Sequence, residues 1–469
     1  MTTVERSFED RFAEARSPGP SFQDLLDRDT HPVPPQLRST AKVYQGSHDV
    51  PAERYIDRRF HELEKERLWK RVWQMACRVE ELPEVGDTVV YDIADLSFLL
   101  VRSTPDTIKG YWNACLHRGR LLRDGDGWAH ELRCPFHGYA WNLDGSLKQI
   151  PADWDFPHVD KSQFNLPEVQ VGIWQGWVFI NPDPNAGSLE EFLGVLDWHF
   201  EGWDLENRYI SAHVAKIVRA NWKLVQEAFS EAYHVVATHP QILASIGDAN
   251  SQYDVWGNVS RAITPNGTPS PHVKWQPTEQ EMFDAMADVR LDEERLVIIP
   301  DGHTAREIGA ANSREMWRPM AGDRVDKMSD AEMMDSFYYT LFPNFHPWGA
   351  FNRIMYRFRP NGDDHETSIM ECYYLTPFQG ERPPPARTHW LGPDDDWIDA
   401  SELGGLSRIF NQDMFNLPKV HKGLKTLRNV KPGVTLANYQ EGKIRMVHNL
   451  IEDYLGLGRG QTMADAGLA

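Results

Sequence analysis

The amino-acid sequence predicts an α+β protein, in which a small antiparallel β domain precedes a larger domain of helices and a curved antiparallel sheet. Between 75 and 185, short runs rich in branched and aromatic residues alternate with Gly, Pro and Asp turns, which is typical of antiparallel strands. Aromatic and branched residues return at 337–360 and 367–378, as expected for strands of a second sheet. Apolar residues at helical spacing predict helices at 188–200, 220–239, 406–424 and 439–456.

The expected domain boundaries follow these changes in sequence pattern. Residues 1–53 are predicted to be an N-terminal arm or linker, irregular over 15–37, because prolines at positions 18, 20, 32, 34 and 35 disfavour regular structure. Residues 54–74 are predicted to form an amphipathic helix that belongs with the larger domain. The small β domain then spans 75–185, and the larger domain spans 186–469.

Composition excludes several classes of function. The chain has 49 Lys and Arg against 69 Asp and Glu, and this net charge of −20 argues against nucleic acid or an anionic membrane surface as a partner. No apolar stretch reaches the roughly 20 residues of a membrane span, and the first residues lack the apolar segment of a signal peptide. Four cysteines are too few for a disulfide scaffold, so we expect a cytoplasmic protein.

One stretch contains two mixed pairs of metal-binding side chains. Cys115 and His117 are separated by one residue, and Cys134 and His137 follow with two residues between them. Thiolate and imidazole bind soft or borderline metals, so two such pairs on two loops could clamp one site. A structural zinc knuckle is the alternative interpretation, but zinc sites usually pair Cys with Cys. Mixed pairs suit a binuclear centre in which one iron takes both thiolates and the other takes both imidazoles.

A second group of candidate ligands follows on the predicted helix 220–239. At about 100° per residue, Glu227, Glu231 and His234 share one helix face, whereas His239 points about 140° away from His234. The helix must therefore bend, widen or end near Pro240 if both imidazoles are to meet one ion. Two histidines and one carboxylate leave three octahedral positions open, which suits an Fe(II) that binds O₂ beside a substrate. The alternative is a purely structural histidine pair.

These motifs resemble those of the Rieske non-heme iron oxygenases, in particular the large (alpha) subunit of the aromatic ring-hydroxylating type. The resemblance is carried by C-x-H-R-G, by C-P-F-H-G, and by an acid-x-x-His-x₄-His pattern that Glu231, His234 and His239 match. It implies a Rieske [2Fe-2S] domain over 75–185, with the cluster on both Cys/His pairs, and a helix-grip-like catalytic domain over 186–469. It also implies one Fe²⁺ per subunit, with Asp413 of the NQDMFN stretch (411–416) as the third ligand beside His234 and His239.

The resemblance also implies a function. A terminal oxygenase of this type uses O₂ and electrons from an NAD(P)H-dependent reductase, with or without a ferredoxin, to hydroxylate or dihydroxylate an apolar, aromatic compound. The family forms head-to-tail homotrimers, in some members with a small beta subunit, so that His137 of one subunit would reach Glu231 and His234 of the next. Glu227, one turn earlier on the helix, is expected close to the iron. A bare Rieske electron carrier is the remote alternative, and it would leave most of the chain unexplained.

Glu231 departs from the family pattern, which usually has Asp at this bridging position. Glutamate at this position resembles relatives that hydroxylate or demethylate alkyl or N- and O-methyl substrates, so a monooxygenase or demethylase is the alternative to a ring dioxygenase. We expect Cys77 and Cys372 to be small buried hydrophobes. The substrate pocket is predicted to be lined around the aromatic residues Phe229, Phe337, Phe342, Trp348 and Phe351.

Overall fold

The β domain is built on a seven-stranded sheet with the order β2-β11-β10-β5-β4-β3-β6. The structure is a computed structural model that describes residues 7–287 and 297–468. All neighbouring strands of this sheet pair antiparallel. The strands are β2 (Gln74–Arg78), β3 (Asp87–Ile93), β4 (Leu96–Thr104), β5 (Thr107–Trp112), β6 (Gly127–Trp128), β10 (Glu168–Trp174) and β11 (Trp177–Asn181).

Tight turns set the register of this sheet. Gln175 and Gly176 join β10 to β11, and both have positive φ (49° and 77°), which suits a two-residue hairpin turn between twisted strands. A Cβ atom on Gly176 would lie 2.9 Å from a guanidinium nitrogen of Arg78, so the turn also needs glycine for space. A second, three-stranded sheet extends from this domain and consists of β7 (Leu132–Arg133), β8 (Ala140–Trp141) and β9 (Leu147–Gln149).

The larger domain contains a curved sheet in two connected parts. One part has the order β16-β17-β18-β12-β19 and the other the order β13-β14-β15, with bridges Tyr338–Trp348 and Leu341–Phe345 between them. Register shifts in β12 and β17 bend the long strands, as β-bulges do. The strands are β12 (Arg208–Val218), β13 (Gln252–Trp256), β14 (Val259–Thr264), β15 (Ser336–Leu341), β16 (His346–Pro347), β17 (Ile354–Asn361), β18 (Asp364–Pro377) and β19 (His389–Leu391).

The predicted α+β fold is confirmed, with one qualification about the sheet. The predicted strands at 337–360 and 367–378 are present, but β19 pairs parallel to β12 while the other strand pairs are antiparallel. The Pro-rich stretch 382–396 therefore contains a short edge strand.

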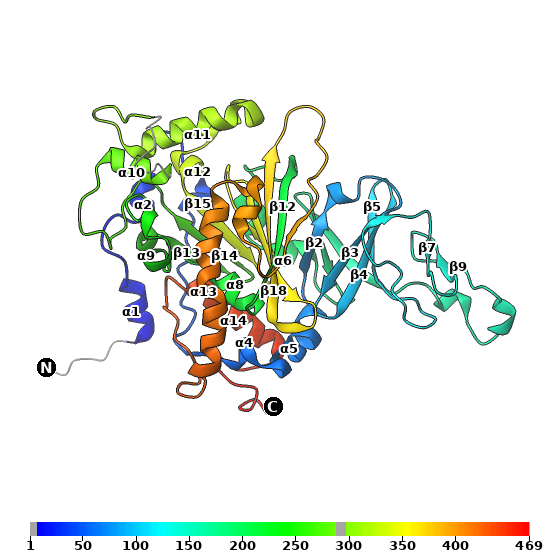
Figure 1. Ribbon diagram of the computed structural model, residues 1–469. Helices are drawn as coiled ribbons and strands as arrows, with labels where there is room; N and C mark the ends of the chain where they lie inside the picture. Colours follow the sequence, from blue (N-terminus) through cyan, green and yellow to red (C-terminus); the bar gives the residue numbers. More distant parts are fainter. Residues whose placement is uncertain (1–6, 288–296, 469) are drawn as a thin grey trace.

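Helices cover one face of the curved sheet (Figure 1). Val214 of β12, Cys372 of β18, Val225 and Phe410 lie in one buried cluster, which joins the sheet to α8 (Trp222–Ala228) and α13 (Leu406–Leu427). Asp413 lies on α13, and His234 and His239 flank α9 (Val235–Thr238). The helix α14 (Gly442–Leu455) is the last in the chain. The remaining α-helices of this domain are α6 (Leu189–Leu193), α7 (Leu196–Phe200), α10 (Glu279–Met286), α11 (Ala305–Ala321) and α12 (Asp330–Met334).

The prediction of a single helix over 220–239 is wrong, because α8 ends at Ala228 and α9 begins at Val235. The chain leaves the helix after α8, where the Ser230 hydroxyl donates to the carbonyl of Gln226 at 2.8 Å and so occupies an acceptor that a continuing helix needs. The N–H of Ala232 is taken by the hydroxyl of Tyr253 at 3.0 Å. Tertiary contacts thus replace the helical hydrogen bonds, and Glu231 and His234 lie in the turn between α8 and α9.

The N-terminal segments also differ from expectation. The arm is not irregular throughout, because α1 (Phe8–Glu14), α2 (Phe22–Leu26) and α3 (Pro35–Arg38) are helical, and Ser7 and Ser21 cap the first two of them. A short ladder pairs β1 (Val50–Pro51) with β20 (Gly433–Val434). The predicted helix at 54–74 is divided at Asp57 into α4 (Glu53–Ile56) and α5 (Arg58–Glu64), and it ends in the π-helical turn η1 (Lys65–Trp69).

Buried polar contacts join the two domains. Arg357 of β17 donates to the carbonyl of Ala76 in β2 at 2.6 Å and forms an ion pair with Glu371, also at 2.6 Å. The side chain of Asn344 donates to the carbonyl of Met75 at 3.2 Å and accepts from its N–H at 3.0 Å. Because these groups are buried, separating the domains would leave charged and polar atoms unpaired, which stabilises one domain arrangement.

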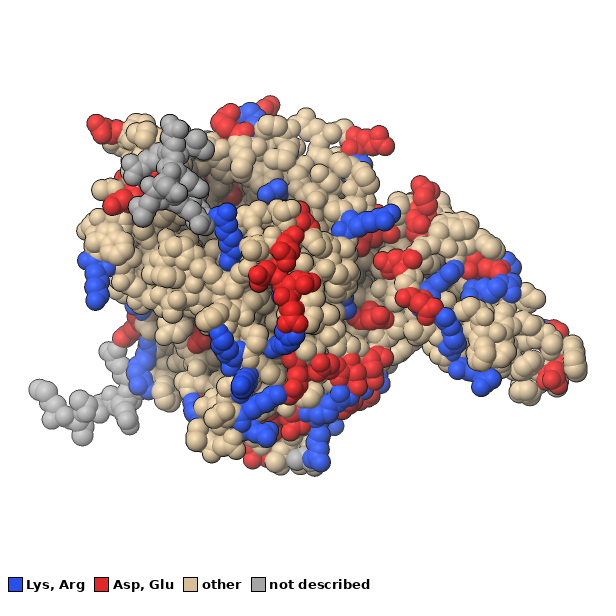
Figure 2. Space-filling model, in the orientation of Figure 1, with Lys and Arg blue, Asp and Glu red and all other residues tan. Residues whose placement is uncertain are grey.

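The surface carries charges of both signs. On the face of the described chain seen in Figure 2, basic and acidic side chains are interspersed. Within 7–287 and 297–468, none of the helices is long and apolar enough to cross a membrane.

Candidate metal centres

The two Cys/His loops of the β domain have nearly the same backbone geometry. In each loop the cysteine N–H donates to the carbonyl five residues later, at 2.8 Å in both cases. A glycine four residues after the cysteine returns a hydrogen bond to its carbonyl, and Gly119 and Gly138 adopt positive φ (75° and 80°) to do so. Two equivalent tight loops therefore face each other, each presenting one thiol and one imidazole.

The side chains at the loop tips are sorted by depth. Cys115 and Cys134 are buried, whereas His137 is exposed. The imidazole rings of His117 and His137 lie 4.6 Å apart between centroids. Burial raises the pKa of the Cys115 thiol, and the adjacent Cys134 thiol raises it further. The backbone N–H of His117, which is directed at the Cys115 sulfur, lowers this pKa. The structure thus brings the predicted ligands together, with both thiols buried, the His117 ring half-buried and the His137 ring exposed.

This donor set fits a binuclear cluster. Nδ1 of His117 is buried and has no hydrogen-bond partner among the residues that the structure describes, as expected of an imidazole nitrogen that binds a metal. The N–H groups of His117 and Arg118 are directed at the Cys115 sulfur, as expected for a sulfur that carries negative charge. Two thiolates on one side and two imidazoles on the other match the ligands of a Rieske cluster.

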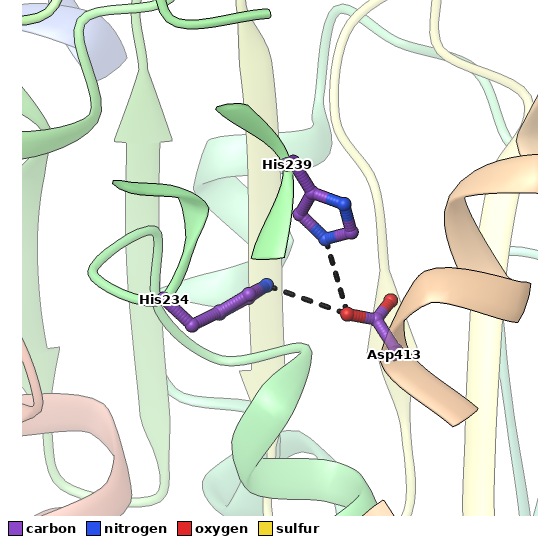
Figure 3. A group of neighbouring side chains, drawn as sticks. All are labelled: His234, His239 and Asp413. Atoms are coloured by element: carbon purple, nitrogen blue, oxygen red, sulfur yellow. Dashed lines mark hydrogen bonds and ion pairs between the residues drawn. The ribbon is translucent and has the colours of Figure 1, made fainter. Parts of the chain in front are cut away.

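A second group of three side chains lies in the larger domain (Figure 3). One ligand atom from each of His234, His239 and Asp413 can be chosen so that all three lie within 4.8 Å of one another. Nε2 of His239 is 3.1 Å from Oδ1 of Asp413, and Nε2 of His234 is 3.6 Å from the same oxygen. Two neutral imidazoles and one carboxylate in this arrangement fit a divalent iron and leave other coordination positions free.

Two outer acceptors orient the imidazoles. Nδ1 of His234 lies 2.7 Å from Oε1 of Glu231, and Nδ1 of His239 lies 2.8 Å from Oε1 of Gln412. Because both partners present acceptor oxygens, each imidazole carries its proton on Nδ1 and turns the Nε2 lone pair toward Asp413. Burial alone would lower the pKa of His234, but the hydrogen bond and charge of Glu231 raise it.

Glu231 also shapes the local backbone. The second carboxylate oxygen of Glu231 accepts a hydrogen bond from the N–H of His234 at 2.9 Å. This N–H lies at the start of α9, where backbone donors have no partner within the helix. Gln412, in contrast, was not among the predicted site residues. Its position beside Asp413 in the Q-D-x-x-N motif is the signal that could have identified it.

Glu227 is placed differently from the other predicted residues. The contacts of its carboxylate are with Tyr55, whose hydroxyl donates to Oε1 at 2.9 Å, and with Nε2 of His448 at 2.8 Å. Burial raises the pKa of Glu227 to about 8. Its carboxylate thus belongs to a buried polar group that lies one helical turn before Glu231.

The five aromatic residues predicted around the substrate pocket do not form one group. Phe337 and Phe351 lie in one hydrophobic core and Phe342 in another. Phe229 and Trp348 pack on the cluster that joins α8 and α13 to the sheet. Cys77 and Cys372 are buried, which confirms that prediction.

Comparison with known proteins decides the family. The family model "Ring hydroxylating alpha subunit (catalytic domain)" matches residues 190–457, and the model "Rieske [2Fe-2S] domain" matches residues 72–160. The chain belongs to the ring-hydroxylating alpha-subunit family. The two matches confirm the predicted resemblance, and the cofactors are accordingly a [2Fe-2S] cluster and a mononuclear iron.

Two curated relatives illustrate the range of this alpha subunit's family. The glycine betaine monooxygenase oxygenase subunit of Pseudomonas aeruginosa is 29% identical over 223 residues, which cover 46% of this chain and 51% of that protein. The carnitine monooxygenase oxygenase subunit of Escherichia coli K12 is 31% identical over 220 residues, which cover 46% of this chain and 58% of that protein. The chain therefore spans about half the length of the curated relatives it matches.

Solved structures show the same fold. A quaternary ammonium Rieske monooxygenase bound to L-carnitine has a TM-score of 0.59 at 18% identity, covering 87% of this chain and 95% of that chain. A naphthalene 1,2-dioxygenase variant bound to phenanthrene has a TM-score of 0.60 at 17% identity, covering 91% and 97%. The predicted combination of a Rieske domain with a curved-sheet catalytic domain is thereby confirmed.

Proposed function

We propose that this chain is the terminal oxygenase component of a multicomponent Rieske oxygenase. The observation that carries the proposal is the convergence of His234, His239 and Asp413, with both histidines oriented by acceptors, in a chain that also carries a Rieske domain. A bare electron carrier would need neither the three ligands nor their outer partners. When bound, the two metal centres supply single electrons and a site at which O₂ is reduced beside the substrate.

In this proposal each side chain has a defined task. Nε2 of His234, Nε2 of His239 and Oδ1 of Asp413 would hold the iron. Glu231 and Gln412 keep both Nδ1 protons in place, which fixes the imidazoles in the tautomer that binds metal. Cys115, His117, Cys134 and His137 hold the [2Fe-2S] cluster.

Electron transfer is proposed to occur between subunits. β7 leads into the loop of Cys134 and His137, and Figure 1 places β7 and β9 at the right end of the molecule, away from α9 at the left. Phe136 and Trp154 near the loop tips are 56% and 79% exposed, as expected of a surface that a partner covers. We therefore propose a head-to-tail homotrimer in which His137 approaches Glu231 of the neighbour, with an NAD(P)H-dependent reductase as the electron source.

For the substrate we favour an N-methyl or other alkyl-amine compound over an aromatic ring. Glu231 replaces the usual Asp, and the curated relatives described above act on glycine betaine and carnitine. Phe229 packs edge-on against Tyr356 and Phe410, with ring centroids 5.3 and 5.5 Å apart, beside the helix that carries Asp413. Aromatic faces with nearby carboxylates favour a cation, although the same rings would also stack on an aromatic substrate.

Product analysis with ¹⁸O₂ distinguishes these activities. The holoprotein with a reductase would be supplied with quaternary amines and with arenes, and substrate-stimulated O₂ uptake would be measured. Hydroxylation beside nitrogen should give an amine and an aldehyde with one ¹⁸O atom, whereas ring dihydroxylation should give a diol with two. If the metal-loaded protein shows no stimulated uptake with either class, this assignment of substrates is wrong.

A further inference from the structure

The carboxylate of Glu227 is held by two fully buried side chains. Besides the contacts of Oε1 with Tyr55 and His448 described above, the Tyr55 hydroxyl lies 3.0 Å from Nε2 of His448, so the three groups form a closed triangle. Tyr55 and His448 are 0% exposed, whereas the Glu227 side chain is 15% exposed. Glu227 is thus the member of this triad that reaches accessible space.

The charges around the triad leave Glu227 without a counter-ion. Lys223 pairs with Glu64 at 2.7 Å, and Arg54 pairs with Glu452 at 2.5 Å. Both of these cations are therefore balanced by their own carboxylates. The charged and titratable groups that face the triad are His48, Arg54 of α4, Glu64 of α5, Lys223 of α8, Glu231 of the following turn, Glu441 at the start of α14, and Arg445 and Glu452 of α14.

Burial and the neighbouring acids favour the neutral form of Glu227. Burial is the main cause of its raised pKa, and Glu441 and Glu231 add to it, whereas Tyr55 and Lys223 oppose it. Burial holds the pKa of His448 well below its usual range, helped by Arg54 and Lys223, so His448 is neutral. Its Nδ1 has no hydrogen-bond partner among the described residues, so the ring proton is on Nε2 and is donated to Oε1 of Glu227, which leaves Oε2 for the acid proton. The geometry and the charges therefore agree on a protonated carboxyl beside a neutral imidazole.

We propose that Glu227 is a stored proton for oxygen reduction, kept as a neutral carboxylic acid by burial without a counter-ion and positioned by Tyr55 and His448. The proposal rests on the oxygenase function proposed above. From Glu227 the chain runs through one turn to Glu231, whose carboxylate bonds the candidate iron ligand His234. The acid therefore lies on the backbone segment that builds the iron site, with its other side anchored to α4 and α14 (Figure 1).

The net reaction defines what the proton does. Hydroxylation follows R–H + O₂ + 2 e⁻ + 2 H⁺ → R–OH + H₂O, with the electrons drawn from the external reductase. The O–H bond of Glu227 breaks, and its proton is one of the two that reduced oxygen takes up. The carboxylate that remains accepts the Tyr55 hydroxyl proton in a hydrogen bond, and a proton from water restores the acid.

Infrared spectroscopy of the metal-loaded protein tests the protonation state without any catalytic assay. The difference between wild type and Glu227→Gln near neutral pH should contain a carboxylic-acid C=O band that disappears as the pH rises through about 8. Tyr55→Phe removes a donor that stabilises the carboxylate, so it should shift this titration to higher pH. Glu81→Gln is a matched control, because burial also raises the pKa of Glu81, a residue of the β domain, to about 7. In this variant the acid band of Glu81 should vanish while the band of Glu227 persists. The lack of an acid band for Glu227 near neutral pH would overturn the proposal.

Turnover tests the second half of the proposal. Gln is a neutral isostere of the protonated acid, so Glu227→Gln should keep both metal centres and the thermal stability near pH 6. It should nevertheless lower substrate-coupled O₂ consumption roughly 10²-fold or more, as expected for loss of a proton donor. Glu227→Asp should restore part of the rate, and Glu81→Gln should leave it unchanged.

The two proposals can fail separately. If the acid band is present but Glu227→Gln turns over normally, Glu227 is only a structural acid and this inference is wrong. If the band is present and no substrate class stimulates O₂ uptake in the wild type, the oxygenase proposal fails and the protonation state stands.

The stability that Glu227 contributes is complete below its ordinary pKa of 4.5 and is lost as the pH rises through about 8, so wild type should become less stable than Glu227→Gln well above pH 8.

Discussion

Gln412 offers a sharp test of the candidate iron site, because its side chain acts on the metal only through His239. In Gln412→Leu the shape of the side chain is largely kept, but the acceptor for the His239 Nδ1–H is lost. That hydrogen bond is 2.8 Å long, and the His239 side chain is 4% exposed. Water therefore cannot readily replace the lost acceptor, and the imidazole is no longer fixed in the tautomer that presents Nε2 to Asp413.

The size of the effect follows from this burial. An unsatisfied buried donor costs about 1–3 kcal/mol. At about 1.4 kcal/mol for each factor of ten, the dissociation constant for Fe²⁺ should rise roughly 10–100-fold. The assay is competitive Fe²⁺ binding against a chelator under anaerobic conditions, with the [2Fe-2S] absorption recorded in the same samples as a check on folding.

Gln241→Leu is the matched control. The Gln241 amide donates to the same oxygen of Gln412 at 2.9 Å, but it does not contact the imidazole. Its removal should change iron affinity by only a small factor. Equal affinities of Gln412→Leu and wild type would refute the argument that this outer acceptor orients His239.

Three further predictions concern the ligands themselves. Asp413→Ala should lose the mononuclear iron and all turnover while keeping the [2Fe-2S] absorption, because the two ligand sets lie in different domains; iron retained at full occupancy would move the third ligand elsewhere. His117→Cys should lower the reduction potential of the cluster, since thiolate donates more charge than imidazole, and voltammetry showing no shift would contradict its role as a ligand. Glu231→Gln should preserve both centres but slow re-oxidation of the reduced cluster by substrate and O₂, because His234 loses a charge-assisted hydrogen bond worth about 1.5–3 kcal/mol. Unchanged re-oxidation would mean that Glu231 has no role in electron transfer and only accepts the N–H of His234 at the start of α9.

Local sequence patterns were sufficient for the elements whose causes are local. Turn residues between short strands predicted the β domain, and helical periodicity predicted α13 and α14 within a few residues. The four Cys/His ligands could be chosen from the sequence because each loop of six residues closes on itself through its own backbone hydrogen bonds. Such a loop needs little from the rest of the fold to present its ligands.

The sequence by itself therefore identified the candidate iron ligands and the two loops proposed to hold a cluster. Only the tertiary structure decided where the helix at 220–239 breaks, because Tyr253 takes a hydrogen bond that periodicity assigns to the helix. It also decided the partners of the site residues, since Gln412 is 173 residues from His239, and Tyr55 and His448 are 172 and 221 residues from Glu227. The pKa of a buried acid depends on such distant neighbours and on the exclusion of water, and neither is written in the residues beside it.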